Sequence, residues 1–141
     1  MMQLIDLFQS MNFLVYFGTT AQNVEYSENL TELGVNLVSI ELNASTFDQL
    51  LLKINPSVVL FDRFMIEEQY GWRVAQNCPN AIRILDTEDL HCLRHARQNA
   101  VKENRSFIET DLISDISKRE IASILRCDTT LMVSEFEIDL L

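Results

Sequence analysis

Short apolar runs recur along the chain and predict five β-strands. The runs are rich in Val, Ile, Leu and Phe, and apolar positions are nearly continuous within them. Strands that are buried on both faces have this pattern, which is typical of a parallel sheet. The five predicted strands cover residues 13–17, 36–40, 58–61, 81–85 and 129–133.

Segments with helical spacing of apolar residues separate these strands. The predicted helices cover residues 4–11, 26–33, 45–54, 66–77, 89–104 and 114–126. Gly34 is a suitable helix stop before the second strand. Ser134 and Glu137 have the spacing of a capping box and predict the start of a further helix. Because strands and helices alternate, the sequence predicts an α/β fold with a mainly parallel sheet.

Length and charge narrow the class of protein. The 141 residues, 48% of them hydrophobic, indicate one domain over residues 1–141 with a sizeable core. The formal net charge is −10, and no Lys or Arg precedes Lys53. An acidic surface repels phosphate backbones, which argues against nucleic-acid binding and leaves solubility as the simpler role of the charge.

The cysteines and the opening residues predict a soluble cytoplasmic protein. Cys78, Cys92 and Cys127 are odd in number and widely spaced, which argues against a disulfide framework or a zinc site and for reduced thiols. Residues 1–6 place an acid where a secretion signal has a basic region. No apolar run approaches the ~20 residues that span a bilayer.

Candidate chemistry follows the third and fourth predicted strands, because ligands of open α/β sheets bind beyond the carboxyl ends of strands. These loops carry Glu67 and Glu68 after one strand, and Asp86, Glu88, Asp89 and His91 after the other. Carboxylates accept hydrogen bonds from sugar hydroxyls, and the second set also includes acid, base and metal-ligand types. Helix capping or first-turn charge is the structural alternative for the acids, and a hydrogen-bonded structural role is the alternative for His91.

Basic side chains lie off the apolar face of the predicted helix 89–104. They are Arg94, His95, Lys102 and Arg105, and Arg97 flanks the apolar face. Such a stripe predicts contact with a phosphate group or with an anionic membrane surface. A solvated helix face, balanced by Glu103 and Glu109, is the alternative.

Motifs of several other enzyme classes are absent from the sequence. It contains no Gly-x-Gly-x-x-Gly, no phosphate-binding loop of the Walker type and no Gly-x-Ser-x-Gly nucleophile elbow. With three glycines in all, the chain cannot form a glycine-rich phosphate cradle. We therefore predict no cofactor and no metal.

Residues 84–91 read Ile-Leu-Asp-Thr-Glu-Asp-Leu-His and are followed by Leu93, Arg94 and Arg97. This segment resembles group 1 glycosyltransferases, in which a strand ends in an Asp-Thr-x-Asp-Leu-His-x-Leu-Arg pattern. The resemblance covers nearly the whole chain, and its upstream part is similar to one bacterial branch of the group. The further matching positions are 58–64, 67–69, Gly71, Trp72, Lys118, Glu120, Cys127, Asp128, 131–134, Glu137 and Leu140.

The resemblance implies the acceptor-side half of a two-domain, GT-B type glycosyltransferase. That half is Rossmann-like, with helices on both faces of the sheet, and it faces a nucleotide-sugar-binding domain across a cleft. The implied reaction is hexosyl transfer to a glycan or lipid-linked acceptor, as in the synthesis of bacterial cell-surface polysaccharides. His91 is the implied catalytic residue, and the implied acceptor-binding residues are Glu67, Glu68, Asp86, Glu88, Asp89 and Arg94.

The chain departs from the family pattern at both ends. It opens in a helix, so the family's first strand is missing, and it stops one turn into a helix, before any donor-binding domain. The missing strand would be central, between the strands at 13–17 and 58–61. We therefore expect either a closed-up sheet of five strands or an exposed gap, and no activity from the chain alone.

Two alternatives to a truncated transferase remain at this point. The first is a non-enzymatic module of flavodoxin or receiver type, for which Asp62 alone among the required acids is in place. The second is a split subunit that pairs with a separate donor domain. Separate placement of Glu67, Asp86 and His91 would contradict a shared site.

Overall fold

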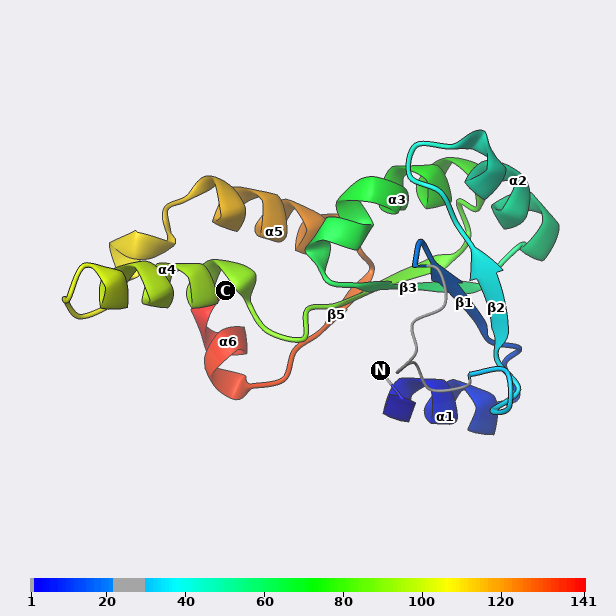
Figure 1. Cartoon of the computed structure of the whole chain (residues 1–141), viewed down its shortest axis with the longest axis horizontal. Helices are drawn as coiled ribbons and strands as arrows, with labels where there is room; N and C mark the ends of the chain where they lie inside the picture. Colours follow the sequence, from blue (N-terminus) through cyan, green and yellow to red (C-terminus); the bar gives the residue numbers. More distant parts are fainter. Residues whose placement is uncertain (1, 22–29) are drawn as a thin grey trace. The chain divides into compact units, whose positions relative to one another are not determined.

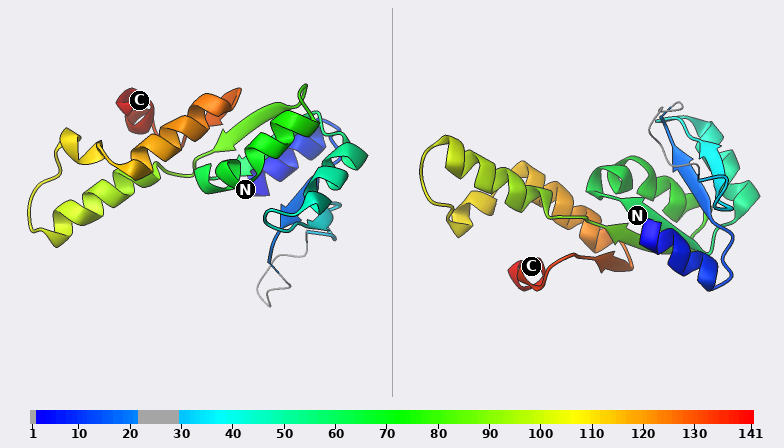
Figure 2. Two further views of the ribbon diagram at one scale, coloured as in Figure 1. Left: turned by 90° about the horizontal axis from the view of Figure 1, so that it is seen from above. Right: turned by 60° about the horizontal axis from the view of Figure 1, so that its bottom comes forward.

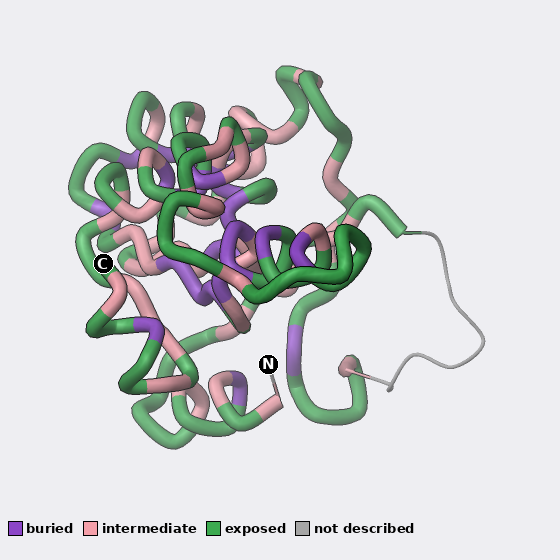
Figure 3. Tube along the Cα trace, turned by 90° about the vertical axis from the view of Figure 1, so that its left-hand side faces the viewer, coloured by how far each residue is buried: buried purple, intermediate pink, exposed green. Residues whose placement is uncertain are grey.

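The computed structural model describes residues 2–21 and 30–141 and confirms an α/β fold with parallel strand pairing. The chain forms two compact units, Met1–Phe47 and Asp48–Leu141. The five strands pair as one two-stranded and one three-stranded sheet (Figure 1). Most of the fully buried hydrophobic residues belong to the second unit, as the purple segments of the chain trace indicate (Figure 3).

The first unit consists of one helix and a parallel strand pair. Helix α1 (Met2–Ser10) precedes β1 (Tyr16–Thr19), which pairs with β2 (Asn36–Ser39). The predicted helix at 26–33 begins outside the described residues, and residues 30–34 form a turn. Gly34 has a φ of 76°, a conformation that glycine adopts without strain.

The second unit is built on the three-stranded sheet. Strand β3 (Val58–Asp62) pairs with β4 (Ile82–Asp86), and β4 pairs with β5 (Thr129–Leu131). Both ladders are parallel, and Asp86 is in register with Asp62 on one side and Leu131 on the other. The carboxyl ends of all three strands therefore meet at one edge, and Phe61 and Leu85 are buried just before it.

Helices follow each strand of this sheet, as the sequence pattern predicts. They are α3 (Phe64–Asn77), α4 (His91–Lys102), the 3₁₀ turn η1 (Glu109–Leu112), α5 (Asp115–Arg126) and α6 (Glu135–Leu140). Helix α2 (Ser45–Ile54) begins before the boundary between the two units. Helices α4 and α5 lie side by side in each view (Figure 2). Their core is Leu90, Cys92 and Leu93, packed against Phe107, Leu112, Ile116, Ile124, Met132 and Leu140.

Serine side chains cap the last two helices, and the one predicted at Ser134 differs from a full capping box. Ser114 caps α5 by accepting a hydrogen bond from the Ser117 amide, and Ser134 caps α6 by accepting one from the Glu137 amide. A capping box would also direct the Glu137 carboxylate back to residue 134. It accepts a hydrogen bond from the Leu90 amide instead, which ties α6 to the start of α4.

Helices α3 and α5 are joined by an ion pair between a buried carboxylate, Glu67, and a half-exposed guanidinium, Arg126. The Glu67 side chain is 2% exposed, and its two carboxylate oxygens accept hydrogen bonds of 2.5–3.0 Å from Arg126. Ser123 on α5 donates a hydrogen bond to the Phe64 carbonyl oxygen at the start of α3. A Cβ added at Gly71 would overlap the Glu67 carboxyl group, so only glycine leaves room for this pair.

We predict that Gly71→Ala destabilises the protein although alanine is the better helix former. The helix-propensity gain is about 1 kcal/mol, and turning a buried carboxylate away from its arginine costs more, so we expect a net loss of about 1–2 kcal/mol. The free energy of unfolding in urea measures it. The matched control, Gln76→Ala at an exposed position of α3, should change it by less than about 0.5 kcal/mol. A Gly71→Ala protein as stable as the parent would contradict the packing.

Candidate functional site

The loop from β4 to α4 carries most of the predicted site residues. Thr87 is 1% exposed, and both its amide and its hydroxyl donate hydrogen bonds to the Leu131 carbonyl oxygen, which holds the loop to β5. Asp86 is also buried, and its carboxylate accepts a hydrogen bond from the Glu88 amide. Glu88 has a φ of 57° and an exposed side chain. The loop is therefore a fixed turn that presents polar side chains beyond the end of the sheet.

Two buried carboxylates from other helices cap the start of α4. Glu120 of α5, 1% exposed, accepts hydrogen bonds from the amides of His91 and Cys92 at 3.0 and 2.8 Å. Glu137 of α6, 7% exposed, accepts one from the Leu90 amide at 3.1 Å. We call Glu120 and Glu137 the α4 carboxylate clamp. The first amides of a helix have no partner within the helix and carry its positive dipole end, so both acids are stabilising here.

The clamp replaces the local capping that the sequence suggests for Asp86 and Asp89. The residue before α4, Leu90, makes no side-chain cap, and neither aspartate accepts the hydrogen bonds from the amides of residues 90–92. The two aspartate carboxylates instead make other contacts, Asp86 with the Glu88 amide and Asp89 with Arg94.

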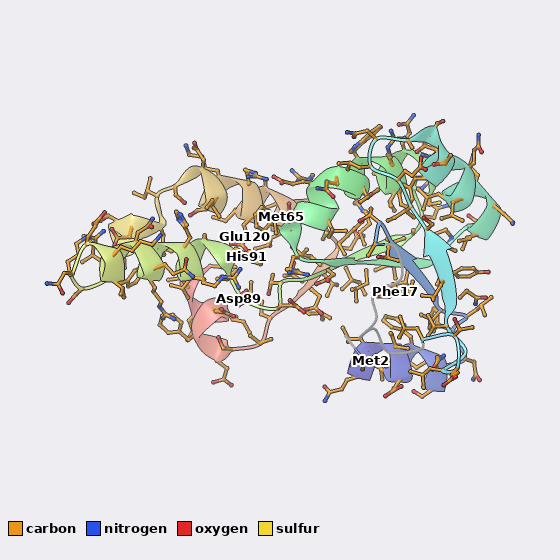
Figure 4. All side chains as sticks on the ribbon, in the orientation of Figure 1. Met2, Phe17, Met65, Asp89, His91 and Glu120 are labelled. Atoms are coloured by element: carbon orange, nitrogen blue, oxygen red, sulfur yellow. The ribbon has the colours of Figure 1, made fainter. Side chains whose placement is uncertain are left out.

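The His91 ring is held through its Nδ1 atom. Nδ1 lies 3.3 Å from the Asp89 carbonyl oxygen, 3.6 Å from an Asp89 carboxylate oxygen and 3.7 Å from Oε1 of Glu120. A carbonyl oxygen only accepts a hydrogen bond, so the contact with Asp89 is a hydrogen bond when Nδ1 carries the proton. Figure 4 shows Asp89, His91 and Glu120 gathered at the start of α4. The edge of the ring also meets Phe64, with centroids 5.4 Å apart.

Charged side chains surround the loop. Arg94 pairs with the Asp89 carboxylate at 3.1 Å, and Arg63 lies 3.7 Å from Glu88 and hydrogen-bonds Asp62. The structure thus brings together five of the predicted site residues, namely Asp86, Glu88, Asp89, His91 and Arg94.

The other two predicted residues, Glu67 and Glu68, interact with α5. Glu67 is enclosed and bound to Arg126, and Glu68 accepts hydrogen bonds from Arg119 at 2.9 and 2.6 Å. Their helix begins beside the histidine, because Phe64, its first residue, contacts the His91 ring. Glu67, Asp86 and His91 therefore belong to one unit, although the Glu67 carboxylate does not join the polar groups of the β4–α4 loop.

The sequence pattern indicated no role in capping α4 for Glu120 or Glu137. Glu120 was a matching position of the resemblance, and Glu137 was both a matching position and part of the predicted capping box. One signal for Glu120 exists in hindsight: it lies one turn after Ile116 and one turn before Ile124, on the inward stripe of α5. An acid on an apolar stripe needs a buried partner.

Burial also alters the cysteines. It raises the pKa of the Cys92 thiol to about 12, with the Glu120 carboxylate adding to the effect. Burial and the Glu67 charge raise the pKa of Cys127 to about 11, and burial raises that of Cys78. Among residues 2–21 and 30–141, no group of three or more His, Cys, Asp and Glu side chains could hold a metal ion. No helix in the same ranges is long and apolar enough to cross a membrane.

We predict that Glu120→Ala destabilises the protein by about 3 kcal/mol or more, because two buried amides lose their acceptor. Glu120→Gln keeps one acceptor oxygen and should cost about 1 kcal/mol. Urea denaturation measures both. Glu135→Gln, an exposed acid in the first turn of α6, is the control and should cost less than about 0.5 kcal/mol. Equal losses for Glu120→Ala and the control would show that the clamp contributes nothing.

A second prediction concerns the thiols. With the pKa of Cys92 near 12 and that of Cys127 near 11, we expect both to react with iodoacetamide at pH 8 at least about 100-fold more slowly in the folded than in the unfolded protein. Mass spectrometry of alkylated peptides measures the ratio. The raised values also mean that stability is fully present below the unfolded thiol pKa and declines as the pH rises past it. Rapid labelling of native Cys92 would refute the assignment.

Comparisons of the chain with protein-family models, with curated proteins and with solved structures found no match. The resemblance of residues 84–91 to glycosyltransferases therefore stays a prediction. The chemistry of the site is therefore inferred from its own geometry.

Proposed function

We propose that this chain is the acceptor-side domain of a glycosyltransferase that moves a sugar from a nucleotide-sugar donor to a saccharide acceptor. One observation carries the proposal: His91 is fixed through Nδ1 at the carboxyl edge of the sheet, beside Glu88 and Asp89. With the proton on Nδ1, the Nε2 atom of the neutral ring accepts a hydrogen bond. An imidazole held in this way is suited to receive the hydroxyl that attacks the donor sugar.

The surrounding charges suit the same chemistry. Proton transfer from an acceptor hydroxyl to Nε2 would make an imidazolium, and the oxygens of Asp89 and Glu120 near Nδ1 would stabilise its charge. Glu88 and Asp89 could accept hydrogen bonds from other sugar hydroxyls, and Arg94 holds Asp89 in place. None of these roles needs a metal ion or a cofactor in this domain.

The proposal extends to the fold. It makes the chain a Rossmann-like half of a GT-B enzyme, in which a first strand would lie between β1 and β3 and join five strands in one sheet. The described strands pair as two separate parallel sheets, β1–β2 and β3–β4–β5. The donor site would belong to a partner domain, so the chain is proposed to be inactive alone and to act in the cytoplasm, where its thiols stay reduced.

Saccharide binding tests the proposal. We expect glucose, mannose or N-acetylglucosamine to shift the backbone amide signals of residues 88–91 in a saturable NMR titration of the full chain, with millimolar affinity. His91→Ala should weaken this binding at least about fivefold, since the ring supplies one directed hydrogen bond. The ring is 12% exposed and packs against Phe64, so the urea midpoint should fall as well, and the binding is measured where the variant remains fully folded. His95→Ala, an exposed histidine on the same helix, is the control.

Titration with nucleotides tests whether the chain also binds the sugar donor. UDP and GDP should produce no saturable shifts, because the proposal assigns donor binding to another domain. Tight nucleotide binding by this chain, or no response to any saccharide, would refute the acceptor assignment. A loss of stability in His91→Ala without a loss of binding would return the histidine to a structural role.

A further inference from the structure

We propose that an open groove along α4 binds a phosphorylated saccharide, with the phosphate on Arg97 and a sugar hydroxyl on the Glu137 carboxylate. The groove has a volume of about 610 Å³. Its lining runs the length of α4 and is completed by Glu137 of α6: Asp89, Leu90, Leu93, Arg94, Arg97, Gln98, Val101, Lys102 and Glu137. Its volume is in the range of sites for small molecules.

One carboxylate oxygen of Glu137, which lines the groove, accepts no hydrogen bond from the described residues. Oε1 of Glu137 accepts the hydrogen bond from the Leu90 amide, whereas Oε2 is buried and has no hydrogen-bond partner among the described residues. The residue is 7% exposed, so this oxygen lacks bulk water as well as a protein donor. A buried carboxylate oxygen without a donor is costly, and a ligand hydroxyl that reaches it supplies the missing bond.

Two cationic side chains of α4 that line the groove have no ion-pair partner among the described residues. Arg97 and Lys102 make no ion pair with a described carboxylate, in contrast to Arg94, which pairs with Asp89. The Arg97 guanidinium lies 5.3 Å from the centre of the Phe136 ring and 6.0 Å from that of Phe107, which fixes its position while leaving its charge uncompensated. In a protein of net charge −10, two neighbouring uncompensated cations select an anion.

The spacing of these groups defines the ligand. The backbone of Arg97 lies about 10 Å along the α4 axis from that of Leu90, and its guanidinium lies over the ring of Phe136, the residue before Glu137. A phosphate suits the planar guanidinium, and hydroxyl groups suit a carboxylate acceptor. Val101, which is 77% exposed, offers apolar surface to the C–H face of a sugar ring. A phosphorylated saccharide combines all three features.

The inference rests on the proposed function only where it makes this ligand the acceptor of sugar transfer. Binding itself needs no donor and no transfer. Asp89 and Leu90 line the groove, so shifts of their amides accompany either proposal, and the variants separate the two. His91→Ala should weaken only the binding assigned to the histidine, whereas Arg97→Gln should weaken only the binding of the phosphorylated ligand in the groove.

Glucose 6-phosphate is the probe, titrated into the full chain and followed by NMR shifts of α4 amides. We expect it to bind at least about tenfold more tightly than either glucose or inorganic phosphate, since each of these makes only half of the contacts. Phosphatidylglycerol vesicles form a separate arm, because a lipid headgroup shares this chemistry. Vesicle binding without glucose 6-phosphate binding would overturn the assignment to a soluble saccharide.

Two variants separate the ends of the groove. Arg97→Gln should weaken glucose 6-phosphate at least about fivefold and leave glucose unaffected, because it removes only the phosphate contact. Glu137→Gln keeps the oxygen that the Leu90 amide needs but replaces the free acceptor by a donor, so it should weaken both ligands without loss of stability. Lys53→Gln, an exposed cation on α2, is the control.

The outcomes are decisive in either direction. Equal affinities for glucose 6-phosphate and phosphate would show that the cations attract any anion, and the saccharide contact would be wrong. Unchanged affinity in Glu137→Gln, with increased stability, would show that Oε2 is only a strained buried charge. Urea midpoints of both variants and of the control accompany each titration.

Discussion

The second unit depends on the α4 carboxylate clamp. The first amides of α4 point away from any local cap, and Glu120 and Glu137 supply the missing acceptors from helices that come 29 and 47 residues later. Because each bond joins a helix end to a distant helix, the clamp fixes tertiary structure and secondary structure at once. The His91 ring, the Cys92 thiol and the end of the β4–α4 loop all take their positions from it.

Burying two carboxylates has a cost that the surroundings only partly offset. Glu120 is well compensated, because both of its oxygens accept amide hydrogen bonds and the His91 ring nitrogen lies nearby. Glu137 has one partner and one vacant oxygen. Both carboxylate oxygens of Glu120 on α5 thus have hydrogen-bond donors, whereas one oxygen of Glu137 on α6 has none. Glu137 also lines the groove. That asymmetry separates a purely structural acid from one that can also meet a ligand.

The sequence predicted the elements of this fold better than their connections. All five strands and most helices overlap the segments that the apolar pattern predicts. Burial accounts for this pattern in β3 and β4, whereas β1 and β2 contain no buried residue. The pairing of Glu67 with Arg126 and of Glu120 with the α4 amides involves residues far apart in the chain, so no local pattern indicated them. The same limit applies to the site. The loop after β4 was identified from strand position, but the exposure of Glu88 and the enclosure of Glu67 depend on packing.

One helix thus serves two sets of contacts. At its first turn, α4 presents His91 to the edge of the sheet, and along its length it presents Arg94, Arg97 and Lys102 to the groove. Asp89 belongs to both, since it approaches the His91 Nδ1, pairs with Arg94 and lines the groove. A ligand that draws Arg94 away from Asp89 would change the charge next to the imidazole. The α4 helix, held by buried acids at its start, therefore carries both the histidine and the cations that line the groove.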